Sequence, residues 1–212
     1  MAKIKICGLF RSCDIDFVNE AEPDYIGFVF AKSPRQVSSS QAMNLRSQLK
    51  SGIVPVGVFV NAPPMLIQQL YRQHIIEIAQ LHGMEDEAYM QKLKNLCDIP
   101  IIKAISVKKT EDIYPWQNSS ADYLLLDNVG GGTGKAFDWR LIPPCKKPFF
   151  LAGGIGISNI ETALSLSPYC VDVSSGAETD GKKDNEKILK LVQKARGGAF
   201  HGFYSKTECK KR

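Results

Sequence analysis

Cys7 and Asp127 are the residues of this chain whose types and positions could do acid–base chemistry. Cys7 ends the apolar run Lys3–Cys7, and Asp127 ends the run Tyr123–Asp127. A thiol with an ordinary pKa of about 8.5 needs only a modest positive field to yield thiolate near neutral pH. A carboxyl that donates a proton at pH 7 needs a pKa raised by burial or a like charge. Alone, each residue is more often structural; facing one pocket, they could act as base and acid.

Two glycine- and serine-rich turns could bind an anion. Gly153-Gly154 closes the run Pro148–Gly153, and Ser174-Ser175-Gly176 closes the run Cys170–Ser174. Backbone N–H groups in such turns can approach a phosphate closely, because glycine has no Cβ. The pairing therefore predicts a phosphate site made by Gly153, Gly154, Ser174, Ser175 and Gly176.

Three more polar residues stand in or near such runs. Arg35 follows Ser33-Pro34 in a rigid turn, where it could form a surface ion pair or a bidentate clamp on a substrate carboxylate. His82 ends a run and is either a structural histidine or a supporting site residue. Asp172 lies inside a run, so we interpret it as an internal polar contact rather than a catalytic group.

The loop Gly130–Lys135 is rich in glycine but does not fit a phosphate-binding P-loop. The first required glycine is replaced by Val129, and Ala136 stands where the motif needs serine or threonine. We expect this segment to be a mobile loop over the active site.

Eight short apolar runs must position these residues, with gaps of roughly 20 to 30 residues that leave room for one helix each. The predicted strands are Lys3–Cys7, Asp24–Phe30, Ile53–Val60, Ile76–His82, Pro100–Ile105, Tyr123–Asp127, Pro148–Gly153 and Cys170–Ser174. Even spacing and strands that are apolar on both faces predict an α/β fold, a single closed (β/α)8 TIM barrel. The competing architecture is an open doubly wound sheet, which usually has about five or six strands. In a barrel, the carboxyl ends of the strands carry the chemistry.

Helices are predicted between the strands, the first over residues 12–21 and the last over about 184–196. The helix after the fifth strand should be short or absent, because Pro115 interrupts a weak apolar period there. Ser38 or Ser39 is expected to cap the second helix, and Ser158 the helix after Gly153-Gly154.

Length and composition favour one globular domain over residues 1–197, followed by a basic, flexible tail over 198–212. The net charge is +5, and residues 206–212 carry four positive charges and one negative, which leaves +2 for the rest. A nucleic-acid partner is therefore not expected. The six cysteines show no metal-ligand spacing, and no apolar stretch approaches a membrane span. We expect a cytoplasmic protein with no membrane partner, a monomer by default although a dimer is possible.

Ten short strings, in order along the chain, resemble the phosphoribosylanthranilate isomerase family over about residues 3–196. They are Lys5–Leu9, Gly27–Phe30, Ser33–Arg35, Gly57–Asn61, Gln80–Gly83, Leu126-Asp127, Gly131–Lys135, Phe137–Trp139, Leu151–Gly154 and Val173–Gly176. The resemblance implies an Amadori rearrangement in tryptophan biosynthesis. It converts N-(5-phosphoribosyl)anthranilate to 1-(2-carboxyphenylamino)-1-deoxyribulose 5-phosphate without metal or organic cofactor. Phe10 departs from the threonine usual in the family.

The same resemblance implies a role for each site residue. Asp127 would be the general acid that protonates the furanose ring oxygen, and Cys7 the general base that removes the C2′ proton. Arg35 would hold the anthranilate carboxylate, and the two turns would hold the phosphate. His82 matches a family histidine at a strand end.

Two alternatives stay open. Another phosphosugar barrel enzyme would need a metal-binding His/Asp set or a catalytic Lys–Glu pair, and Lys103 has no obvious carboxyl partner in the sequence. A non-catalytic phosphate-binding module would keep the glycine turns and need neither Cys7 nor Asp127.

Overall fold

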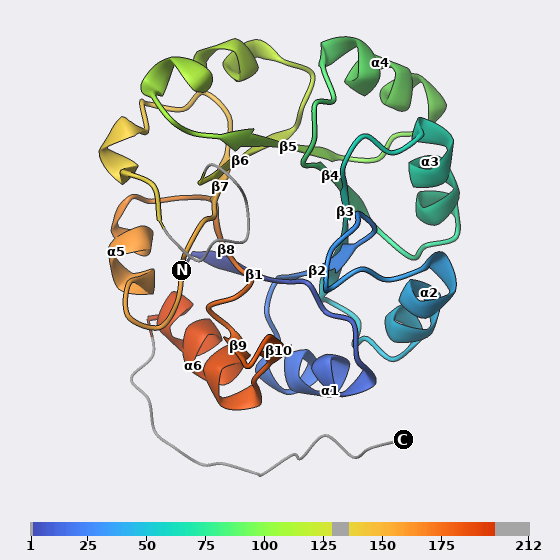
Figure 1. Ribbon diagram of the computed structural model, residues 1–212, viewed down its shortest axis with the longest axis vertical. Helices are drawn as coiled ribbons and strands as arrows, with labels where there is room; N and C mark the ends of the chain where they lie inside the picture. Colours follow the sequence, from blue (N-terminus) through green and yellow to red (C-terminus); the bar gives the residue numbers. More distant parts are fainter. Residues whose placement is uncertain (1, 129–135, 198–212) are drawn as a thin grey trace.

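The computed structural model describes residues 2–128 and 136–197. Eight parallel strands close into a barrel in sequence order, with β1 hydrogen-bonded to both β2 and β8, and the helices surround it (Figure 1). The strands are β1 Lys3–Cys7, β2 Tyr25–Val29, β3 Val54–Phe59, β4 Ile78–Leu81, β5 Ile101–Ser106, β6 Tyr123–Asp127, β7 Phe149–Leu151 and β8 Cys170–Val173. The predicted (β/α)8 barrel is confirmed. The loop Gly130–Lys135 and the tail 198–212 lie outside the described residues.

Within the described ranges, five α-helices and three 3₁₀ turns lie between the strands, and a sixth α-helix follows the final described strand. The helices are α1 Ser12–Ala21, α2 Ser39–Ser47, α3 Pro64–Arg72, α4 Glu87–Leu96, α5 Ile160–Ser165 and α6 Asn185–Ala195. The 3₁₀ turns are η1 Thr110–Asp112, η2 Tyr114–Asn118 and η3 Trp139–Leu141. The two turns after β5 stand where a short or absent helix was expected. A short antiparallel hairpin, β9 Glu178–Thr179 with β10 Lys182–Lys183, precedes α6 and was not predicted.

Side-chain caps set where several helices begin. The Ser38 hydroxyl accepts from the Gln41 N–H at α2, and the Asp86 carboxylate accepts from the Tyr89 N–H at α4. The prediction that Ser158 caps α5 is wrong, because Asn159 is the N-cap residue. The Asn159 side chain serves the preceding turn instead, accepting from Gly156 N–H at 2.8 Å and donating to Gly154 C=O at 3.0 Å.

Strand alternation divides the buried residues into two groups. Outward side chains such as Ile4 and Ile6 pack with the helices in the larger apolar cluster. Inward side chains such as Val56, Leu125 and Phe150 fill the barrel. The interior also contains three buried polar side chains near its carboxyl-end mouth, those of Lys5, Gln80 and Asp172.

The opposite, amino-end mouth is closed by aromatic side chains. Tyr25, Tyr123 and Tyr169 contact Phe150 with ring centroids 5.5–5.7 Å apart. The Lys3 ammonium donates to the Tyr25 hydroxyl at 3.2 Å and to the Tyr169 hydroxyl at 2.8 Å. Among the described helices, none is long and apolar enough to cross a bilayer.

Candidate active site

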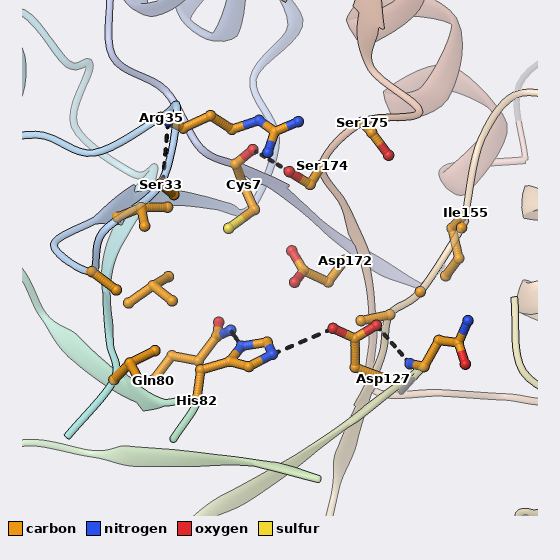
Figure 2. Close-up of a pocket in the computed structure, with 18 of the residues that line it drawn as sticks. Cys7, Ser33, Arg35, Gln80, His82, Asp127, Ile155, Asp172, Ser174 and Ser175 are labelled. Atoms are coloured by element: carbon orange, nitrogen blue, oxygen red, sulfur yellow. Dashed lines mark hydrogen bonds and ion pairs between the residues drawn. The ribbon is translucent and has the colours of Figure 1, made fainter. Parts of the chain in front are cut away.

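The carboxyl ends of the strands enclose a cavity of about 290 Å³. Figure 2 shows Cys7 and Asp127 on opposite sides of this cavity, both facing its open centre. The lining residues include these predicted site residues: Cys7, Arg35, His82, Asp127, Gly153, Gly154, Ser174 and Ser175. Gly176 packs behind the lining, where a Cβ would lie 2.0 Å from the Ile155 carbonyl oxygen. One cavity therefore gathers residues that are spread over most of the chain.

Cys7 is the last residue of β1 and is buried against β2. Its register partner is Gly27, where a Cβ would come within 2.6 Å of the Cys7 sulfur. Burial raises the pKa of the Cys7 thiol, and the Asp172 carboxylate adds to this rise. The Lys5 and Lys183 ammonium groups oppose it by stabilising the thiolate. Cys7 thus combines a buried sulfur with nearby positive charge.

Asp127 ends β6 and uses its two oxygens differently. Oδ1 accepts from the Asn128 N–H at 2.7 Å, while Oδ2 lies 3.3 Å from His82 Nε2. A Cβ at Gly153, which has a φ of +85°, would lie 2.8 Å from Oδ1. Oδ2 is therefore the oxygen that can carry a proton toward a ligand in the cavity.

A chain of hydrogen bonds determines the tautomer of His82, that is, which ring nitrogen carries the proton. The Lys5 ammonium donates to Gln80 Oε1 at 2.9 Å, so the Gln80 amide Nε2 faces His82 Nδ1, also at 2.9 Å. Because an amide nitrogen can only donate, Nδ1 is the acceptor, and the neutral imidazole carries its proton on Nε2. His82 consequently presents an N–H to Asp127.

Arg35 makes a side-on pair with Glu178 of the β9–β10 hairpin. Nε and Nη2 each donate to one Glu178 carboxylate oxygen at 2.7 Å, and this contact raises the Arg35 pKa. The side-on edge of the Arg35 guanidinium is thus occupied by a protein carboxylate. The end-on edge of Nη1 and Nη2 is left for a ligand. Glu178 also binds the buried Lys183 ammonium, which donates to the Ser174 carbonyl at 3.1 Å.

The two predicted anion turns lie side by side. Gly153 and Gly154 both have positive φ, of +85° and +64°, and Gly156 bridges to Gly176 of the other turn. The Ser174 hydroxyl donates to the Cys7 carbonyl at 3.2 Å, which ties the second turn to β1. Adjacent backbone turns of this kind can cradle a phosphate.

Lys5, Gln80 and Glu178 belong to the site architecture but were missed by sequence reasoning. Lys5 lies two residues before Cys7, and Gln80 lies two before His82. Residues two apart on a strand share a face, so this spacing could have found both. Glu178 carries no comparable signal, because its partners Arg35 and Lys183 are brought to it by the hairpin.

The expectation that Lys103 lacks a carboxyl partner is wrong. Its Nζ lies 3.6 Å from Glu85 Oε2 and donates to the Gly83 carbonyl at 2.8 Å. Glu85 in turn accepts from the N–H groups of Asn61 and Gly83. Neither member of the pair lines the cavity, so it braces the turn after β4. Within residues 2–128 and 136–197, no group of three or more His, Cys, Asp or Glu could hold a metal ion.

Comparisons with known proteins agree on one family. A family model described as N-(5′-phosphoribosyl)anthranilate (PRA) isomerase matches residues 4–194. A relative from Endomicrobium trichonymphae, named N-(5′-phosphoribosyl)anthranilate isomerase, is 47% identical over 198 residues, which cover 91% of this chain and 98% of the relative.

Solved structures give the same result. Phosphoribosyl anthranilate isomerase from Thermotoga maritima is 34% identical with a TM-score of 0.85, covering 93% of this chain and all of its own. A phosphoribosyl anthranilate isomerase in complex with reduced 1-(o-carboxyphenylamino)-1-deoxyribulose 5-phosphate is 32% identical with a TM-score of 0.79. That match covers 93% of this chain and 100% of the other.

Proposed function

Since the chain belongs to the N-(5′-phosphoribosyl)anthranilate isomerase family, which acts in tryptophan biosynthesis, we propose that Cys7 and Asp127 are its general base and general acid. The reaction is the Amadori rearrangement of N-(5-phosphoribosyl)anthranilate to 1-(2-carboxyphenylamino)-1-deoxyribulose 5-phosphate. The observation that carries the proposal is the position of the two groups on opposite sides of one cavity.

Ring opening is assigned to Asp127. Its Oδ2 donates a proton to the furanose ring oxygen, the C1′–O bond breaks, and the anthranilate nitrogen lone pair forms the C1′=N bond of a Schiff base. The carboxylate that remains accepts from the Asn128 N–H, 2.7 Å from Oδ1, and from the Nε2–H of His82, 3.3 Å from Oδ2. These two contacts hold the carboxyl group in place at the cavity while its proton leaves.

Proton removal is assigned to Cys7. The thiolate takes the C2′ proton, the electrons of that C–H bond form the C1′=C2′ bond, and the π electrons of C1′=N return to nitrogen. The enolamine that results tautomerises to the ketone. The iminium next to C2′ acts as the electron sink, so a base as weak as a thiolate is sufficient. General acid and base assistance of this type contributes roughly 10²–10⁴-fold each.

Two anion sites would hold the substrate between these groups. The end-on edge of Arg35 would bind the anthranilate carboxylate, and the turns at Gly153-Gly154 and Ser174–Gly176 would bind the phosphate. Val29, Val58 and Val60 supply an apolar part of the lining that suits the aromatic ring. Binding at both ends fixes the sugar carbons relative to Cys7 and Asp127.

Loss of phosphoribosylanthranilate fluorescence during turnover tests the proposal. We expect Cys7→Ala and Asp127→Asn each to lower kcat by roughly 10²–10⁴-fold while the substrate still binds. Cys97→Ala and Asp122→Asn are matched controls away from the cavity and should keep wild-type turnover. Near-native rates in both site variants would contradict the assignment. A wild-type protein that binds phosphate but consumes no substrate would favour the non-catalytic module.

A further inference from the structure

Lys5 is a buried ammonium directly beside the Cys7 sulfur. It lies two residues before Cys7 on β1, its side chain is 0% exposed, and it faces the barrel interior. Its Nζ donates to Asp172 Oδ1 at 3.0 Å and to Gln80 Oε1 at 2.9 Å, and its side chain shares the inward face of β1 with that of Cys7. An ammonium has three N–H donors, and these two hydrogen bonds use two of them.

A buried lysine is unfavourable at this position unless it is compensated, because removing an ammonium from water costs several kcal/mol without an opposite charge and hydrogen bonds. Burial alone would lower the Lys5 pKa, but the Asp172 carboxylate and the Cys7 thiolate outweigh burial and raise it. Lys5 therefore stays charged. Asp172 neutralises that charge, and the Cys7 sulfur is the partner whose own charge can vary.

We propose that Lys5 is a positioning residue that stabilises the thiolate form of Cys7 at the cavity, with Asp172 and Gln80 fixing the ammonium beneath the sulfur. The inference rests on Cys7 being the general base and deepens that assignment. Through Gln80 and His82, the same ammonium also orients the N–H that faces Asp127. One buried cation thus supports both proposed catalytic groups.

Other charged groups face Cys7 from neighbouring elements. Asp172 of β8 disfavours the thiolate, while Lys183 of β10 favours it, and Arg35 from the loop after β2 also interacts with it. Lys183 and Arg35 share the Glu178 carboxylate, which offsets part of their positive field. Lys5 is distinguished from them by its place on β1, two residues before Cys7 and on the same inward face.

The pH dependence of Cys7 alkylation by iodoacetamide tests this inference. The thiolate displaces iodide, so the rate follows the thiolate fraction, and mass spectrometry of the Cys7 peptide separates it from the other cysteines. Lys5→Met should move the midpoint upward by about one pH unit, which slows alkylation about tenfold near neutral pH. Asp172→Asn should move it downward, since a negative charge is removed. The turnover of Lys5→Met should recover as the pH rises and thiolate returns.

Lys3→Met is the matched control, because Lys3 lies on the same strand but contacts Tyr25 and Tyr169 at the other mouth. Its alkylation profile should match that of the wild type. If Lys5→Met does not fold, the variant with both Lys5→Met and Asp172→Asn removes the pair without leaving a lone charge. Its midpoint should lie above that of Asp172→Asn.

An unchanged profile in Lys5→Met, or shifts of equal sign in the two single variants, would overturn the inference. In the double variant, a midpoint at or below that of Asp172→Asn would do the same. Alkylation requires no isomerase turnover. A failure here is therefore distinguishable from a failure of the acid–base assignment, which appears as retained turnover in Cys7→Ala.

Discussion

At the scale of single residues, each proposed catalytic side chain rests against a glycine. The Cys7 sulfur lies where a Cβ on Gly27 would be, and Asp127 Oδ1 lies close to the space that a Cβ on Gly153 would fill. Both glycines therefore do more than shape turns or strands. They let a reactive group approach the backbone of the neighbouring strand or turn closely.

Gly27→Ala tests this at the base. A methyl group 2.6 Å from the sulfur must displace Cys7, because Cys7 Cα and Cβ also lie within 3.3 Å of it. Overpacking of this kind costs roughly 1–3 kcal/mol of stability. We expect a folded protein with a large loss of kcat. Substrate fluorescence measures the kcat, and thermal unfolding shows whether the variant is folded. A variant with wild-type turnover would show that Cys7 tolerates displacement.

The site residues that end strands were predicted from the sequence. The residues that lie deeper in the barrel, Lys5 and Gln80, were not. Cys7 and Asp127 stand out because a polar group closes an apolar run. Lys5 and Gln80 are inside runs, where each would pass as an exposed polar position of an alternating strand. Their spacing of two residues from Cys7 and His82 puts them on the same strand faces as those residues, and the barrel register, which pairs Lys5 with Asp172 across β1 and β8, shows that the Lys5 face points inward.

At the scale of elements, the β9–β10 hairpin connects the loop after β2 to the end of β8. Its register places Lys183 opposite Glu178, and Glu178 reaches Arg35 from there. Two-residue strands are too short to show a period in the sequence, so this element could not be predicted. The longer strands and the helices could, because their apolar patterns and caps are local signals.

Glu178→Gln is expected to destabilise the protein by about 3 kcal/mol, because it leaves the buried Lys183 ammonium without a full counter-charge. It should also raise KM, since Arg35 loses its side-on support. Urea unfolding and steady-state kinetics measure the two effects. Glu186→Gln on the exposed face of α6 is the control, with a change within about 0.5 kcal/mol.

The difference in the free energy of unfolding between Glu178→Gln and the wild type should depend on pH. Burial opposes ionisation of Glu178, but Arg35 and Lys183 outweigh it and lower the pKa of this carboxyl. The stabilisation is therefore complete above the ordinary glutamate pKa of about 4.3. It is lost as the pH falls through the lower pKa of the folded state. A constant difference across acidic pH would contradict this linkage.

At the scale of the whole molecule, the two mouths of the barrel have different contents. The carboxyl-end mouth holds the charged site, and the amino-end mouth holds Lys3 with a cluster of tyrosines around Phe150. Eight evenly spaced apolar runs were enough to predict the ring of strands. The pairing of β1 with β8, which closes the barrel, joins residues far apart in the chain. Its prediction therefore rested on the number and spacing of the strands and not on a local pattern.

Tyr169→Phe should separate stability from activity. It removes a hydroxyl that accepts from Lys3 at 2.8 Å and lies 2.9 Å from the Tyr25 hydroxyl. We expect a cost of about 1–2 kcal/mol, seen as a lower Tm, with turnover unchanged. Tyr114→Phe at an exposed position should change neither quantity. A fall in kcat for Tyr169→Phe would show that the amino-end mouth influences the chemistry.

The pairing of β1 with β8 has a consequence for the order in which the site forms during synthesis. Lys5 and Cys7 are synthesised before Asp172 and Ser174, with which they form hydrogen bonds. A nascent chain that lacks its eighth strand has no Asp172 to pair with Lys5 and lacks the Ser174–Gly176 turn of the proposed phosphate site. The site is therefore complete only after β8 has been synthesised and has paired with β1.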